Sequence, residues 1–520
     1  MFISIICPND IKDAFLGIAN HIYNNLTKAP KPGKIRKMGW FNHHCTRSLR
    51  ALKHALKVKP RDPKAIAVCR REYNQALRTR KRELRMIAWD KLEAASRAGD
   101  SRTYWLIINE SSFAKKDELP NIEVNVPEDL WITHFSNLYK MSDLYPNTYL
   151  PSVPLDLSLS HVLTPPARSF FMPTVDEVIL AIKTSVGNKA PGPDGIPVDV
   201  FKANIPFWAP LIANVFRATA YAGKMPTWSQ AVIVPIFKKG NRGDPACYRP
   251  ISLLDSLVKV LGRVLLARME EWSIRIQDQE GIQYGFRRGI GTVEQCLNLS
   301  LLIGKYTVAK PGTLYLAFMD LSCAFDSVSH SKLWGTLSRL GMDPCLLDII
   351  RDIYSGATAS VRFGRNGERT RDFNIAKGVR QGCVLAPFLF ILYIMDLEKN
   401  LLVGGGDFPK VGSRSLPALL FADDAVLMGR TPKALQSLIN RFTTYMSKLD
   451  LKVNISKTFT MSCSVKPPTR SFYFTLNDSR ILPTENFTYL GLIFNEKGSW
   501  NQNIISSMEM PKEYWGINPV

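Results

Sequence analysis

The sequence has no apolar run long enough to cross a membrane and no cysteine pair at zinc-binding spacing. Its longest apolar stretch, Val384 to Met395, is shorter than the ~20 residues of a transmembrane helix and contains Pro387. The nine cysteines include no Cys-x-x-Cys, so we expect free thiols in a reducing compartment. The opening residues lack a basic start and a cleavage site typical of a signal peptide. We therefore expect a protein that is neither secreted nor membrane-bound.

Acidic residues are scarce relative to basic ones. The chain has 45 Asp and Glu against 67 Lys and Arg, a net charge of +22, and residues 28–91 alone hold 20 basic and 4 acidic residues. Leu49, Leu52 and Leu56 recur there at helical spacing, which predicts two basic amphipathic helices separated by the proline-containing residues 59–63. So basic a surface favours contact with nucleic acid, because phosphates would neutralise it; a solvated helical face is the alternative.

The remainder of the chain alternates short β-rich runs with amphipathic stretches, which is typical of an α+β fold. A segment rich in Pro, Ser and Leu, residues 142–166, predicts a linker. Thr174 and Glu177 have the spacing of a capping box and predict a helix start. The expected strands are 231–237, 313–319 and 419–428, and the expected helices are 175–183, 254–272, 387–400 and 432–449.

Acidic residues occur at the ends of two predicted strands. Asp423 and Asp424 lie between apolar runs, which predicts a β-hairpin with acids at its tip, and Asp320 ends the run 313–319. Asp320 could therefore lie beside Asp423. Neighbouring carboxylates repel each other, and two Mg²⁺ ions about 3.5–4 Å apart need such convergent oxygen ligands. A solvated turn is the alternative for Asp423 and Asp424. We expect Asp326 to be an acid at a helix N-terminus.

Eight short blocks, in order, resemble the reverse transcriptase of non-LTR retrotransposons (LINEs) of the jockey-like kind. They are KAPGPDGIP (189–197), YRPISLL (248–254), QYGFR (283–287), DLSCAFD (320–326), GVRQGCVLAP (378–387), FADD (421–424), LKVNISKT (451–458) and YLG (489–491). The resemblance covers about residues 171–494. It implies a right-hand polymerase fold, with a basic helical region (1–141), a linker (142–170), fingers and palm (171–460) and the end of the palm with the start of an incomplete thumb (461–520). Relative to the family we expect a chain truncated at both ends.

The resemblance also implies an activity and its machinery. The activity would be RNA-directed DNA synthesis, in which dNTPs are added to a primer 3′-hydroxyl by two-metal nucleotidyl transfer. The cofactors would be two Mg²⁺ ions, with Mn²⁺ as an alternative, and the partners an RNA template and a DNA primer in the nucleus. Asp320, Asp423 and Asp424 would be the catalytic metal ligands, and Lys457 would lie near the leaving pyrophosphate. A solvated loop lysine is the alternative for Lys457.

The remaining implied site residues bind the nucleotide or the template. Phe325 would exclude a 2′-hydroxyl, or would simply be a core side chain. Gln381 would face the nascent base pair, and Gly382 would allow the backbone to approach closely. The implied triphosphate ligands are Arg249 with either Lys238 or Lys239, and the implied template-side residues are Lys189, Gly192 and Gly195. The alternative function is that of an inactive retroelement fragment that binds RNA or DNA through its basic N-terminal helices.

Overall fold

The computed structural model divides the chain into two units that we describe separately. The first unit comprises residues 1–24 and 124–505, and the second comprises residues 25–123 and 506–520. Residues described by the structure are 13, 15–20, 43–57, 62, 65–76, 78–80, 83, 126–140, 173–221, 229–274, 281–286, 290–308, 312–364, 367–464 and 472–498. The predicted linker, 142–170, lies outside them. In the described residues, no helix is both long and apolar enough to cross a membrane.

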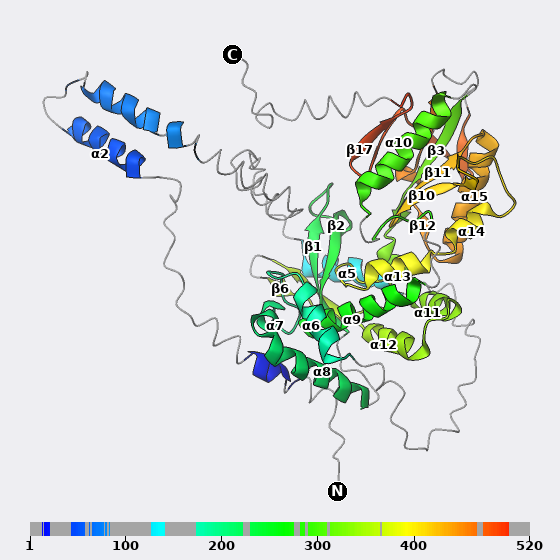
Figure 1. Ribbon diagram of the computed structural model, residues 1–520, viewed down its shortest axis with the longest axis horizontal. Helices are drawn as coiled ribbons and strands as arrows, with labels where there is room; N and C mark the ends of the chain where they lie inside the picture. Colours follow the sequence, from blue (N-terminus) through cyan, green and yellow to red (C-terminus); the bar gives the residue numbers. More distant parts are fainter. Residues whose placement is uncertain are drawn as a thin grey trace, which may run out of the picture. The chain divides into compact units, whose positions relative to one another are not determined.

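The second unit contains the basic helices that the sequence predicts. Helix α2 (His43–Lys57) is followed by helical residues 65–76 and 78–80 (Figure 1). Leu52 is buried, whereas Arg47, Arg50 and Lys53 of the same helix are exposed. The amphipathic pattern is therefore confirmed for α2, and its basic side chains are accessible to a ligand.

The first unit contains a six-stranded sheet, seen beside α10 (Thr292–Val308) and α15 (Pro432–Lys448) in Figure 1. Its order is β10 (Ala418–Phe421), β11 (Asp424–Gly429), β3 (Thr313–Met319), β13 (Phe459–Ser464), β15 (Ser479–Pro483) and β14 (Phe474–Leu476). Helices α10 and α15 pack against β3, which is buried almost throughout. The boundary that we predict after residue 460 falls inside β13, so this sheet continues beyond it.

A second sheet has five strands. β1 (Gln230–Phe237) pairs with β2 (Tyr248–Leu253) and, in parallel, with β5 (Thr358–Phe363), which pairs with β6 (Glu368–Arg369) and β7 (Phe373–Asn374). The other elements are α5 (Glu128–Tyr139), α7 (Asp199–Ala203), α8 (Ile205–Tyr221), η3 (Pro245–Cys247), β4 (Leu321–Ser322), η4 (Phe325–Ser327), α11 (His330–Arg339), α12 (Pro344–Tyr354), β8 (Lys410–Val411), β9 (Arg414–Ser415), β12 (Lys452–Val453), η5 (Ile455–Lys457), β16 (Asn486–Tyr489) and β17 (Leu492–Asn495). Mixed sheets with helices confirm the α+β prediction.

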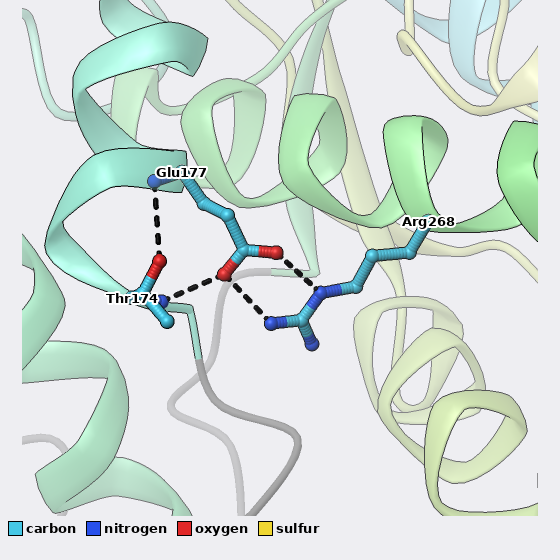
Figure 2. Close-up of polar contacts among 3 residues, drawn as sticks. All are labelled: Thr174, Glu177 and Arg268. Carbon is cyan, nitrogen blue, oxygen red and sulfur yellow. Dashed lines mark hydrogen bonds and ion pairs between the residues drawn. The ribbon is translucent and has the colours of Figure 1, made fainter.

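The predicted capping box is present at the start of α6 (Val175–Thr184). The Glu177 backbone N–H donates to the Thr174 hydroxyl, and the Thr174 N–H donates to the Glu177 carboxylate (Figure 2). Arg268 of α9 (Ser256–Ser273) donates two hydrogen bonds to the same carboxylate, at 2.7 and 2.8 Å. One acid thus caps α6 and ties it to α9, and it was the capping pattern that made this helix predictable.

One predicted helix is broken. The stretch 387–400 forms α13 (Ala386–Tyr393) and α14 (Leu397–Leu402), and the chain turns at residues 394–396. Asp396 at the break makes an ion pair with Arg339 at 2.7 Å, and the Tyr393 hydroxyl donates to the Leu449 carbonyl. These tertiary partners, which an amphipathic pattern does not show, favour two short helices over one long helix.

Candidate active site

The pairing of two strands brings the candidate catalytic acids together. Asp320 follows β3, and Asp423 and Asp424 form the tip of the β10–β11 hairpin, where Phe421 pairs with Asp424. Since β11 pairs with β3 in an antiparallel register that matches Ala425 to Met319, the acids meet at the same edge of the sheet. The predicted hairpin is confirmed, and so is its position beside Asp320.

The tip of the hairpin is held by a side chain to which the sequence assigns no role. The Gln283 amide accepts from the Ala422 N–H at 2.9 Å and donates to the Ala422 carbonyl at 3.2 Å. Ala422 has a φ of 57°, in the left-handed region that a non-glycine residue adopts only when its surroundings stabilise it. Gly285 lies so close that a Cβ would be 2.4 Å from the Ala422 nitrogen. Gln283 therefore fixes the turn that presents Asp423.

The electrostatics of the carboxylates are those of a crowded acidic site. Burial raises the pKa of Asp423, and the charge of Asp320 raises it further. For Asp424, the most exposed of the three, loss of solvent and the charges of Asp423 and Asp320 raise the pKa to about 6. Their mutual repulsion is a cost that a bound cation would remove.

Lys457 is the cation beside these acids. Its Nζ lies 3.6 Å from Asp320 Oδ2, and it belongs to η5, which follows β12. The Asn454 N–H donates to the Asp320 carbonyl at 2.8 Å, so the Lys457 segment is attached directly to the end of β3. The predicted Lys457 thus lies at the acidic site, with its side chain 57% exposed.

Basic residues of the β1–β2 hairpin affect the pKa values of acidic groups in the same region. Burial raises the pKa of Asp423, and the charges of Lys238 and Arg249 partly oppose this rise. The charge of Lys238 likewise partly opposes the rise that burial causes in the pKa of Asp326 and of Cys323. Lys238 and Arg249 are exposed, so both side chains are accessible to a ligand. Of the two lysines left open by the sequence, Lys238 is the one whose influence on the site is evident.

The segment carrying Gln381 packs against the chain after Asp320. The Val379 N–H donates to the Phe325 carbonyl at 2.8 Å, and the Gln381 carbonyl accepts from the Ser252 N–H at 2.7 Å. Gly382 has a φ of 106°, and a Cβ there would be 2.8 Å from the Ser252 carbonyl oxygen. The predicted close backbone approach at Gly382 is therefore made to β2.

Phe325 is half-buried and stacks on Phe390 of α13, with ring centroids 4.9 Å apart. A half-buried ring five residues after Asp320 that stacks on the buried Phe390 fits both interpretations of this residue. Asp326 lies in the first turn of the 3-10 helix η4, as expected of an acid at a helix N-terminus. It is 2% exposed and accepts from the Tyr139 hydroxyl and the Gln381 side chain, and burial raises its pKa to about 6. The expected stabilisation of its charge by the helix dipole is therefore outweighed by burial.

The predicted template-side residues lie in a loop docked on the start of α9. Gly192 is buried, and a Cβ there would lie 2.3 Å from the Leu254 carbonyl carbon; Gly195 closes a turn at a φ of 71°. The Asp194 N–H donates to the Asp255 carboxylate at 3.0 Å. Lys189 is exposed at the edge of this loop.

The donor set suits a hard divalent cation. Carboxylate oxygens are the ligands that Mg²⁺ and Mn²⁺ prefer, and Asp320 Oδ2 is buried without a hydrogen-bond partner. Within the described residues, no group of three or more His, Cys, Asp or Glu side chains is arranged so that it could hold a metal ion. Asp320, Asp423 and Asp424 thus form an acidic site in which Asp320 Oδ2 has the Lys457 ammonium 3.6 Å away but no hydrogen bond.

Comparison with known proteins identifies the class. Residues 236–494 match the profile of the family described as reverse transcriptase (RNA-dependent DNA polymerase). The chain is 30% identical over 320 residues to the Pol polyprotein of retrotransposable element R2 from Popillia japonica, which covers 60% of this chain and 43% of the relative. It is 26% identical over 393 residues to the RNA-directed DNA polymerase of mobile element jockey from Drosophila funebris, covering 73% and 41%.

A transposon X-element polymerase from Drosophila melanogaster is 29% identical over 363 residues, covering 65% of this chain and 37% of the relative. Among solved structures, apo telomerase from Candida Tropicalis truncated from C-terminal domain covers 58% of this chain and 59% of its own, with 14% identity and a TM-score of 0.37. Residues 236–494 of the chain match a reverse transcriptase domain. Within that class the chain is similar to the polymerases of retrotransposable elements, and it spans less than half the length of the curated relatives named here.

Proposed function

We propose that this chain is an RNA-directed DNA polymerase that extends a DNA primer on an RNA template. The observation that carries the proposal is the placement of Asp320 and Asp423 on paired strand ends, with the charges of Lys238 and Arg249 acting on Asp423. An acidic site faced by basic side chains suits the reaction of a nucleoside triphosphate, because the acids can hold divalent cations while the bases bind phosphate oxygens.

Each of the site residues would have a role in nucleotidyl transfer. Lys238 and Arg249 would bind the triphosphate, Phe325 would lie under the sugar and Gln381 would face the nascent base pair. The primer 3′-hydroxyl loses its proton to solvent water, its oxygen forms a bond to the α-phosphorus as the bond to the bridging oxygen breaks, and pyrophosphate leaves. Lys457 would give the leaving group a proton. When bound by Asp320, Asp423 and Asp424, two Mg²⁺ or Mn²⁺ ions would supply charge neutralisation and activation of the hydroxyl.

Primer extension tests the proposal. The purified chain would be given an RNA template annealed to a labelled DNA primer, with dNTPs and Mg²⁺, beside the double variant Asp423→Asn, Asp424→Asn. A matched control is Asp478→Asn, an exposed aspartate in the β14–β15 turn at a φ of 63°, which asparagine also tolerates. We expect extension by the wild type and the control and none by the double variant. A wild type that extends nothing would contradict the proposal.

The second candidate is a nucleic-acid-binding fragment without polymerase activity. The exposed Arg47, Arg50 and Lys53 of α2 favour a binding role for this helix in either case. Reversing all three charges should weaken RNA binding and lower the slope of log affinity against log salt by about 2–3. The control is Lys433→Glu on α15. Unchanged salt dependence would exclude binding through α2. RNA binding that depends on these residues, in a chain that extends no primer, would favour this candidate.

We further propose that the protein works in the nucleus, because its relatives are polymerases of mobile elements and its basic segments suit nucleic acid. Imaging of the tagged full chain tests this: nuclear accumulation is expected, and exclusion from the nucleus would contradict it.

A further inference from the structure

A buried carboxylate near the active site has no part in the mechanism described so far. Asp326 lies six residues after Asp320 and is 2% exposed. Both of its oxygens are occupied: Oδ1 accepts from the Tyr139 hydroxyl at 3.0 Å, and Oδ2 accepts from Gln381 Nε2 at 2.7 Å. It is therefore a hydrogen-bond acceptor within the protein rather than an additional open metal ligand.

The backbone near Asp326 packs closely against the segment that precedes Gln381. The Gly378 N–H donates to the Val328 carbonyl at 2.7 Å. Gly378 has a φ of 92°, and a Cβ there would lie 2.9–3.1 Å from the backbone of Asp326. The segment before Gln381 thus runs directly along the residues around Asp326, and a larger residue at 378 would push the two apart.

The chemistry of the two side chains fixes the orientation of the Gln381 amide. An ionised carboxylate only accepts hydrogen bonds, so Gln381 must turn its NH₂ group toward Asp326. The carbonyl oxygen of the amide then points to the other side, together with the second N–H. Without Asp326 the amide could take either orientation at similar cost. Asp326 therefore selects which hydrogen-bonding groups Gln381 presents.

Tyr139 connects this pair to a helix that precedes the family match at 236–494. Its ring is 3% exposed, and its carbonyl accepts from the Ala376 N–H at 3.1 Å. On the same helix, α5, Trp131 packs edge-on against Tyr248, the neighbour of Arg249, with ring centroids 5.0 Å apart. Helix α5 therefore touches both the strand that carries Arg249 and the segment that leads to Gln381.

We propose that Asp326 is a positioning residue that orients the Gln381 amide toward the incoming nucleotide. Through the hydrogen bond from Tyr139 to Asp326, helix α5 contributes to this positioning. This inference rests on the proposed function. Its consequence is specific: loss of Asp326 should weaken nucleotide selection through Gln381 and through no other route.

A double-mutant cycle in single-nucleotide incorporation tests this. The probe is the dNTP complementary to the next RNA template base, and the variants are Asp326→Asn, Gln381→Ala and the two combined. Asparagine is neutral and can donate as well as accept, so it no longer fixes the Gln381 amide, and this should raise the KM for the dNTP about tenfold, with kcat changed less. In the Gln381→Ala background the same Asp326→Asn change should cost less than about twofold, because the partner is already gone.

Tyr139→Phe extends the test if Asp326→Asn fails to fold, since it removes only one hydroxyl. It should raise KM about threefold, and this effect too should vanish in the Gln381→Ala background. Asp343→Asn is the control, because Asp343 is a carboxylate that only caps α12; it should leave KM unchanged. If Asp326 and Tyr139 had a purely structural role, their variants would have a lower melting temperature and a lower primer–template affinity. Their effect on KM would then add to that of Gln381→Ala.

The outcomes separate the two claims. A wild type that incorporates nucleotide, with losses that multiply across the cycle, overturns the role of Asp326 and leaves the polymerase proposal intact. A wild type that incorporates nothing contradicts both.

Discussion

Gln283 and Ala422 form a two-point contact in which one side-chain amide pairs with both backbone groups of one residue, at 2.9 and 3.2 Å. The same amide oxygen accepts from the Gly285 N–H at 2.8 Å. Asp423 follows Ala422 directly, so the geometry of this contact sets the direction in which the first acid of the hairpin leaves the sheet.

Replacing Gln283 by alanine should therefore reduce catalysis. The change leaves the Ala422 N–H and carbonyl without their partner and releases a strained turn, which we expect to lower kcat by about 10–100-fold with little change in the KM for dNTP. Steady-state incorporation kinetics measure this.

Gln436→Ala is a matched control, because the Gln436 amide pairs in the same way with both backbone groups of Thr475, in β14. It should affect stability but not kcat. Equal losses of kcat in the two variants would show that the Gln283 contact is not specific to the active site.

Gly192→Ala should undock the template-side loop. A Cβ at this position would lie 2.3–2.4 Å from the backbone of Leu254 and Asp255, so the loop must move. We expect a loss of about 2 kcal/mol in the free energy of unfolding and weaker primer–template binding, measured by denaturant unfolding and by fluorescence anisotropy.

The control, Gly335→Ala, has open space around the added methyl group and should be neutral or stabilising by about 0.5–1 kcal/mol. Normal primer–template affinity in Gly192→Ala would contradict the assignment of this loop to the template side.

The paired acids Asp194 and Asp255 predict a pH dependence of stability. Burial, and then the charge of Asp255, raise the pKa of Asp194 to about 7, above the value of about 4 in an unfolded chain. The folded state therefore holds the proton more tightly between these values. The contribution of Asp194 to the free energy of unfolding is therefore fully present below about pH 4, and it is lost as the pH rises through about 7.

Asp194→Asn removes this titration. Chemical denaturation from pH 5 to pH 8 should show the wild type losing stability relative to the variant as the pH rises. A stability difference that stays constant over this range would contradict the pKa shift. Asp478→Asn, an exposed position, should show no such trend.

Phe325→Ala should admit ribonucleotides. Phe325 is half-buried against Phe390, and a smaller side chain would leave room for a 2′-hydroxyl, so the ratio of rNTP to dNTP incorporation should rise. The control is Phe487→Ala, which breaks a comparable stacked pair with Phe318 at 4.0 Å. If the ratio is unchanged in Phe325→Ala, its ring is a core side chain only.

Local patterns predicted much of the fold and of the acidic site. The apolar runs around Asp423 and before Asp320 predicted strands that pair as expected, and the Thr174–Glu177 spacing predicted the start of α6. These features depend on neighbouring residues, and so a single sequence shows them.

The hydrogen bonds made by Asp326 and by Gln283 could not be predicted from local patterns. Tyr139 lies 187 positions from Asp326, and Gln381 lies 55 positions away, so no local spacing indicates that they meet. Gln283 is likewise 139 positions from Ala422. The signals available were that Asp326, Gln283 and Gln381 belong to blocks that resemble the family.

The most direct test of the central claim measures single-turnover incorporation of one dNTP by the wild type, Asp320→Asn, Asp423→Asn and the double variant. If the two acids act as one site, each single change should lower the rate by at least about 10³-fold, and the double variant should be little worse than either. Single variants that retain most of the wild-type rate, or losses that multiply in the double variant, would contradict a shared catalytic site.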